Sequence, residues 1–123
     1  MEQKIAAHCK GIFRSYKIFR PSGAVVQHTR QDFQEWDFKE NHVLTIAAYQ
    51  QHRRKVLVET DQWTITFSNR RYYIQSEKPA LRHEIISINH TGLVIEDPQS
   101  GEKTFFGRLP IWENLVNNRL PVL

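Results

Sequence analysis

Histidines, a lone cysteine and two nearby carboxylates are the side chains of this sequence with the most evident chemical potential. A histidine metal site needs ligands at set spacings, such as two histidines four residues apart on one helix. The six histidines do not have such a spacing: they are His8, His28, His42, His52, His83 and His90. Cys9 is the only cysteine, so it forms no internal disulfide. We expect it to be a small buried residue and not a nucleophile.

Glu59 and Asp61 lie two residues apart, on one face of a strand, where they could form a carboxylate pair. A solvated or salt-bridged rim is the expected role for such a pair, ahead of acid–base catalysis. The sequence contains no glycine-rich phosphate loop and no nucleophile elbow. It therefore predicts a protein that is not an enzyme and uses no cofactor or metal.

Length and composition favour one globular domain over residues 1–123. The chain has 123 residues, of which 40% are hydrophobic, and no apolar run approaches the ~20 residues of a membrane span. The first residues lack the apolar core of a signal peptide, so a cytoplasmic location is expected. The formal net charge is +4, but the basic clusters 53–55 and 70–71 fall in predicted turns. This placement argues against a nucleic-acid partner.

Alternation of apolar and polar residues is the main structural signal. Trp63, Ile65 and Phe67 alternate with polar residues, which is the period of a strand with one buried face. Residues 24–28 either extend the first strand or form an extra one, and residues 76–81 are predicted to be a loop. The same logic predicts eight principal strands, at residues 12–19, 33–38, 43–50, 55–67 with a bend near 59–61, 72–75, 83–89, 93–97 and 103–109.

The hairpin at residues 39–42 leaves two registers open. A three-residue loop whose last residue is left-handed sets Phe38 opposite Leu44, whereas a two- or four-residue loop sets Phe38 opposite Val43. The first is preferred because Leu44, Ile46 and Ala48 form the more apolar set.

Short connections between the strands predict an antiparallel order. Parallel neighbours would need crossovers of a dozen residues or more. We therefore predict an all-β, eight-stranded antiparallel up-and-down meander barrel over about residues 11–109, since closure removes exposed edges. A turn or two of helix is expected at residues 1–8. A short C-terminal helix is expected at about residues 110–118, where Ile111 and Leu115 are four apart and Trp112 is a packing residue.

A family resemblance appears at the two ends of this barrel. Gly11-Ile12-Phe13 resembles the Gly-x-Trp signature of lipocalins, with Phe13 in the position of the tryptophan. Arg108 resembles the basic residue that covers that ring. Segments 36–44, 63–65, 85–88 and 93–96 are similar to small bacterial lipocalin-like (calycin) proteins, so the resemblance covers about residues 9–109. It implies a barrel closed by Gly11, Phe13 and Arg108 that binds a small, largely apolar molecule.

The leading hypothesis is non-enzymatic binding of a small apolar or amphipathic molecule inside the barrel. Inward placement of Phe13 brings Lys17 and Phe19 inward by alternation, and Lys17 could meet an anionic head group. The expected lining is Lys17, Phe19, Trp36, Phe38, Leu44, Ile46, Trp63, Ile65, Tyr73, Ile86 and Phe106. So many large rings also fit the alternative, a filled barrel that acts as a protein-interaction or assembly module. The sequence names neither the ligand nor the oligomeric state.

Overall fold

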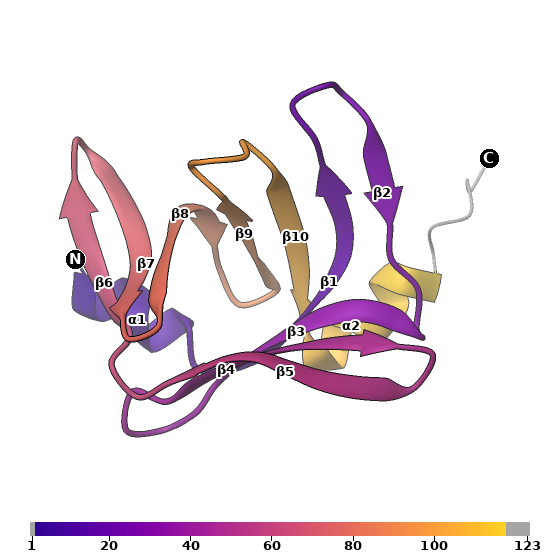
Figure 1. Cartoon of the computed structure of the whole chain (residues 1–123), viewed down its shortest axis with the longest axis horizontal. Helices are drawn as coiled ribbons and strands as arrows, with labels where there is room; N and C mark the ends of the chain where they lie inside the picture. Colours follow the sequence, from indigo (N-terminus) through magenta and orange to yellow (C-terminus); the bar gives the residue numbers. More distant parts are fainter. Residues whose placement is uncertain (1, 118–123) are drawn as a thin grey trace.

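Antiparallel β-structure makes up most of the chain in a computed structural model, which describes residues 2–117 (Figure 1). The elements are α1 (Glu2–His8), β1 (Gly11–Phe19), β2 (Val25–Gln27), β3 (Asp32–Phe38), β4 (Leu44–Gln50), β5 (Arg53–Thr60), β6 (Thr64–Ser68), β7 (Arg71–Glu77), β8 (Ala80–Ile88), β9 (Gly92–Glu96), β10 (Lys103–Arg108) and α2 (Leu109–Asn117). The all-β class, the mostly meander order and the C-terminal helix are thus confirmed. The predicted helix end at residue 118 lies outside the described residues, as does Met1.

The strands form one curled sheet in which the first and last long strands meet. The order is β5-β4-β3-β1-β10-β9-β8-β7-β6, and β2 pairs with β1 beside this path. Phe13 of β1 is opposite Arg108 of β10, so the two ends of the strand sequence are joined in the middle of the sheet. Two wings of strands extend from this seam and curl toward each other, as Figure 1 shows.

The prediction of a closed eight-stranded barrel was wrong, because the predicted strand 55–67 is divided in two. Its first part, β5, pairs with β4, and its second part, β6, pairs with β7. Eight antiparallel pairings separate β5 from β6 along the sheet, so these two strands run in the same direction. Parallel neighbours need a long crossover, whereas only residues 61–63 join them. The result is an open half-barrel of nine strands, with β5 and β6 at its edges.

One short strand and one predicted loop complete the comparison with the expected strands. Residues 25–27 form the separate strand β2, which was one of the two alternatives. The predicted loop 76–81 was wrong, because β7 continues to Glu77 and β8 begins at Ala80. Only residues 78 and 79 remain between these strands. The extra length of β8 creates the edge that borders the pocket described below.

The β3–β4 hairpin has the preferred register. Phe38 is opposite Leu44, and His42 is left-handed with a φ of 59°. Asn41 is left-handed as well, at the same φ. Residues other than glycine adopt this region at some cost, so the turn signal in residues 39–42 is weak.

The inner face of the curl carries the larger hydrophobic core. Alternate residues of both wings meet there, and Ala6 of α1 and Cys9, which follows that helix, close one end. The fully or nearly fully buried members are Cys9, Phe13, Trp36, Phe38, Leu44, Ile46, Trp63, Ile74, Leu93, Ile95 and Phe106. Cys9 is 0% exposed, as expected, and burial raises the pKa of its thiol to about 12 despite the opposing effect of Arg108. Such a thiol stays protonated and is a poor nucleophile.

Helix α2 covers a second, smaller core on the outer face. Trp112 and Val116 of α2 pack with Phe33 of β3, and the Trp112 and Phe33 ring centroids lie 4.7 Å apart. The Trp112 indole N–H donates to the carbonyl of Ser15 at 2.9 Å. The expected packing role of Trp112 is confirmed, and these contacts fix the helix against β1 and β3.

Candidate functional site

Most of the predicted lining residues are together, but they fill the interior of the curl. Trp36, Phe38, Leu44, Ile46, Trp63 and Phe106 belong to one buried cluster, and Ile65 packs against it. The rings are in contact: the Trp36 and Phe106 centroids are 5.6 Å apart, and those of Phe38 and Trp63 are 5.1 Å apart. The interior is occupied by these side chains, and the pockets described below open beside it.

Lys17 and Phe19 do not face this interior, contrary to the sequence prediction. A β-bulge interrupts the pairing of β1 with β10 between Ser15 and Lys17. The extra residue reverses the alternation, so Lys17 is opposite Phe105 and not Phe106. The Lys17 ammonium lies 4.7 Å from the Phe105 ring centroid and 4.9 Å from that of Phe19. These rings stabilise the cation on the outer face.

Tyr73 and Ile86 also lie away from the interior. A second bulge, between Ile85 and Ser87, turns Ile86 outward, where it is 43% exposed. Tyr73 precedes the inward-facing Ile74 and so faces the other side of β7. The Arg82 guanidinium covers the Tyr73 ring at 3.8 Å from its centroid.

Arg108 holds the seam of the sheet with the geometry that the resemblance implied. Its guanidinium lies 4.5 Å from the centroid of the Phe13 ring. It donates to four backbone carbonyls, those of His8, Lys10, Asn89 and His90. Gly11 has a φ of +111°, and a Cβ there would lie 3.3 Å from an Arg108 nitrogen. Glycine is therefore required at this position by both backbone conformation and space.

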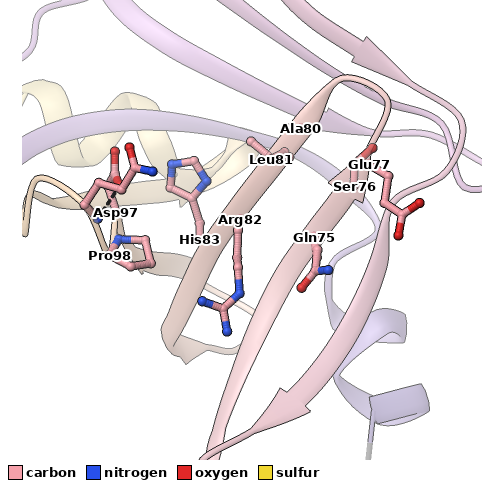
Figure 2. Close-up of a pocket in the computed structure, with 10 residues that line it drawn as sticks. Gln75, Ser76, Glu77, Ala80, Leu81, Arg82, His83, Asp97 and Pro98 are labelled. Carbon is pink, nitrogen blue, oxygen red and sulfur yellow. Dashed lines mark hydrogen bonds between the residues drawn. The ribbon is translucent and has the colours of Figure 1, made fainter.

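A pocket lies where β8 separates from β9. Pairing between these strands begins only at Glu84 and Glu96, so the first residues of β8 have β7 on one side and the β9–β10 turn on the other. We call this space the β8 slot. It has a volume of about 560 Å³, within the range of small-molecule sites. Its lining is Gln75, Ser76, Glu77, Ala80, Leu81, Arg82, His83, Asp97, Pro98 and Gln99 (Figure 2).

His83 connects the β8 slot to the aromatic core. Figure 2 shows its ring beside the turn that carries Asp97 and Pro98, with Arg82 directed to the other side of β8. The His83 and Trp36 ring centroids are 5.2 Å apart, edge to face. Burial lowers the pKa of His83, and the nearby Asp97 only partly opposes that effect. The imidazole is therefore neutral at pH 7, and its buried Nδ1 has no hydrogen-bond partner.

The polar character of the β8 slot comes from side chains of both signs. Glu77, Asp97 and Arg82 are its charged lining residues, and Gln75 and Gln99 supply uncharged amides. Leu81 and Pro98 provide apolar surface between them. This mixture suits a molecule that has both an apolar part and a hydrogen-bonding group.

Ser15 and His28 form the pair most similar to a catalytic one. Ser15 Oγ lies 2.5 Å from His28 Nδ1, and it accepts the backbone N–H of Gln34 at 2.8 Å. Ser15 is 0% exposed, and burial lowers the pKa of His28 more than Asp32 and Ser15 raise it. The hydroxyl satisfies the first β3 amide beyond the β1–β3 ladder, so its role is structural.

Two further pockets lie on the surface of the described part of the chain. One lies between α1 and the β3–β4 turn, with Trp63 in its wall, and has a volume of about 540 Å³. The other lies beside the β1–β2 turn, near Phe19 and Lys103, with a volume of about 360 Å³. Within the described part of the chain, no group of three or more His, Cys, Asp or Glu side chains is arranged to hold a metal ion.

The β8 slot was missed by sequence reasoning because residues 76–81 were interpreted as a loop. A signal was present: Leu81, His83 and Ile85 alternate with Arg82 and Glu84, which is the period of a strand. Extending that strand to residue 81 would have put His83 on the same face as Leu81 and Ile85.

Comparison of the chain with protein-family models, with curated proteins and with solved structures found no match. Fold and site together define a class: an all-β protein with an open, curled antiparallel sheet, a C-terminal helix and a pocket beside β8. Neither α1 nor α2 is long and apolar enough to cross a membrane.

Proposed function

We propose that this protein binds a small amphipathic molecule, without transforming it, in the β8 slot. The observation that carries the proposal is the position of His83, between this slot and Trp36. A buried polar atom without a partner costs about 1–3 kcal/mol. Rotation of the imidazole that brings Nδ1 to the slot would let a ligand hydroxyl or carboxyl group pair with it and remove this penalty. The apolar part of the ligand then packs on Leu81 and Pro98.

The lipocalin-like features support the same proposal. The Arg108–Phe13 contact is of the kind expected from the resemblance to lipocalins, which carry small apolar molecules. The site differs from the sequence hypothesis in one respect: the ligand occupies the slot beside the filled interior. Lys17 takes no part, because it lies on the outer face.

Tryptophan fluorescence tests the proposal. Titration with decanoate and with 1-decanol should change the emission of Trp36, because a ligand at His83 alters the neighbour of that ring. In a Trp36→Phe variant the optical signal should disappear, while calorimetry still detects binding.

A variant of a slot residue, compared with a variant of an exposed residue outside the slot, shows where the ligand binds. Leu81→Asp should weaken binding at least about tenfold, a loss of about 1.4 kcal/mol. Ile86→Asp is the matched control, since Ile86 is exposed and does not line the slot. Absence of binding for both probes, or equal losses in the two variants, would contradict the proposal.

The filled interior favours a second candidate, a protein-interaction module. Trp36, Phe38 and Phe106 are each 3% exposed or less, so the curl itself has the packing of a scaffold. No binding across a panel of lipids and metabolites, in a protein that remains folded, would favour this function over ligand binding.

A further inference from the structure

Strand β5 forms a free edge of the sheet. It pairs with β4 along Arg53–Thr60, and among the described residues no strand pairs with its other side. Val56 is 45% exposed and Leu57 is 48% exposed. An edge with unpaired backbone groups and exposed apolar side chains is a template for pairing with another strand.

Two opposite charges lie on one face of this edge. Arg54 is opposite Tyr49 of β4, and Glu59 is opposite Thr45. Tyr49 packs in the outer-face cluster, and Thr45 shares its face because four residues separate them. Arg54 and Glu59 therefore both point to the outer face, near opposite ends of β5.

Neither charge has an ion-pair partner within the described residues. Glu59 accepts a hydrogen bond from the Thr45 hydroxyl at 3.2 Å. Arg54 lies near enough to Asp37 to lower the pKa of that carboxyl, although burial of Asp37 raises it more. Both groups thus remain available for a partner across the edge.

We propose that two copies of this chain associate through antiparallel pairing of their β5 edges about a two-fold axis. With Val56 opposite the partner's Leu57, Arg54 is opposite the partner's Glu59, and the same ion pair forms again by symmetry. Opposite residues of antiparallel strands share a face. Arg54 and Glu59, five residues apart, share the outer face because a β-bulge adds Leu57 between Val56 and Val58 of β5. In the dimer the two bulges are opposite each other at the two-fold axis. The apolar pair occupies the centre, and one ion pair lies at each end.

The charges also select this arrangement against others. Parallel pairing would set the basic segment 53–55 of one copy beside that of the other, which is repulsive. A one-residue shift would set Arg53 opposite the partner's Glu59, but Arg53 is opposite Gln50 of β4 and so faces the inner side. Strand β6, the other edge, contains no charged residue and is in contact with α1.

Charge exchange tests the proposal directly. Sedimentation velocity from micromolar to near-millimolar protein should show a monomer–dimer equilibrium in the wild type. Arg54→Glu and Glu59→Arg should each raise the dissociation constant at least about tenfold. The double variant Arg54→Glu/Glu59→Arg should recover most of the wild-type affinity, because the pair is restored with its signs exchanged.

Controls separate pairing from net charge and from misfolding. Arg53→Glu changes the net charge as Arg54→Glu does, but we expect it to alter the dissociation constant less than about threefold. Val56→Lys should block association independently of the ion pairs, and circular dichroism verifies each fold. A wild type that stays monomeric at the highest concentration, or a double variant no better than the single ones, would overturn the proposal.

Discussion

At the scale of single residues, His83 connects binding, core packing and pH. Its imidazole contacts Trp36 at 5.2 Å and lines the β8 slot, and its pKa is lowered from 6.5 by burial. The folded protein therefore holds a neutral histidine where the unfolded chain, below about pH 6.5, holds a charged one. A substitution of His83 should therefore affect both the free energy of unfolding and ligand binding.

The lowered pKa of His83 predicts acid sensitivity. As pH falls below 6.5, the unfolded chain binds a proton that the folded protein does not, so the free energy of unfolding decreases. Above pH 6.5 this contribution is constant. Urea denaturation at pH 7.5 and 5.5 should show a smaller decrease for His83→Phe than for the wild type. The decrease should not vanish, because burial lowers the pKa of His28 too. Identical decreases in both proteins would refute this role for His83.

Arg108 should contribute more to stability than its partly exposed position suggests. It donates to four carbonyls from two separate segments, residues 8–10 and 89–90, and covers Phe13. We expect Arg108→Gln to lower the free energy of unfolding by about 2–4 kcal/mol. Arg82→Gln removes a cation from the Tyr73 ring and, among the described residues, no hydrogen bond to a carbonyl, so it should cost less than about 1 kcal/mol. Urea titration measures both, and similar costs would argue against the seam role of Arg108.

At the scale of elements, three tight turns are built from left-handed residues other than glycine. The residues are Asn41, His42, Gln51, His52, Asn69 and Arg70, with φ values between 51° and 68°. Tight hairpin turns of this kind favour Asn-Gly. These residues therefore adopt the turns at a free-energy cost, and the pairing of the adjacent strands offsets that cost.

A glycine in one of these turns should stabilise the protein. The left-handed region costs about 1–2 kcal/mol for a non-glycine residue, against the ~0.5–1 kcal/mol of extra entropy that glycine loses on folding. His52→Gly should therefore raise the free energy of unfolding by about 0.5 kcal/mol. His90→Gly is the control, because His90 is not left-handed, and it should lower stability. A thermal denaturation series measures both, and destabilisation by His52→Gly would contradict the account.

The alternation of apolar and polar residues predicted the positions of most strands correctly. It did not always predict which face of the sheet a side chain points to. The register of Phe38 with Leu44 was predicted and is confirmed. Lys17 and Ile86 were assigned to the wrong face, because each follows or occupies a β-bulge. A bulge adds one residue without a composition signal of its own. Every alternation count that crosses one is inverted.

At the scale of the whole molecule, the division of one predicted strand decides whether the sheet closes. The alternation pattern placed residues 55–67 in β-structure with a bend near residues 59–61, and we interpreted them as one strand. Their common direction, with only residues 61–63 between them, leaves β5 and β6 as edges. Across this corner, Thr60 and Ser76 lie in hydrogen-bond contact at 2.8 Å. Pattern reasoning could not find this result, because it depends on pairing across distant segments.

The same whole-molecule arrangement moves the candidate ligand site out of the interior. Large rings occupy the curl, and the space for a small molecule lies where β8 is longer than β9. Binding in this account therefore requires no expansion of the core.

Amide chemical-shift mapping during titration with decanoate tests this claim most directly. We predict that the shifts concentrate at residues 75–77, 80–83 and 97–99, around the β8 slot, with saturation at one ligand per chain. Shifts concentrated instead at Phe38, Leu44 and Ile46, or no saturable shifts at all, would contradict it.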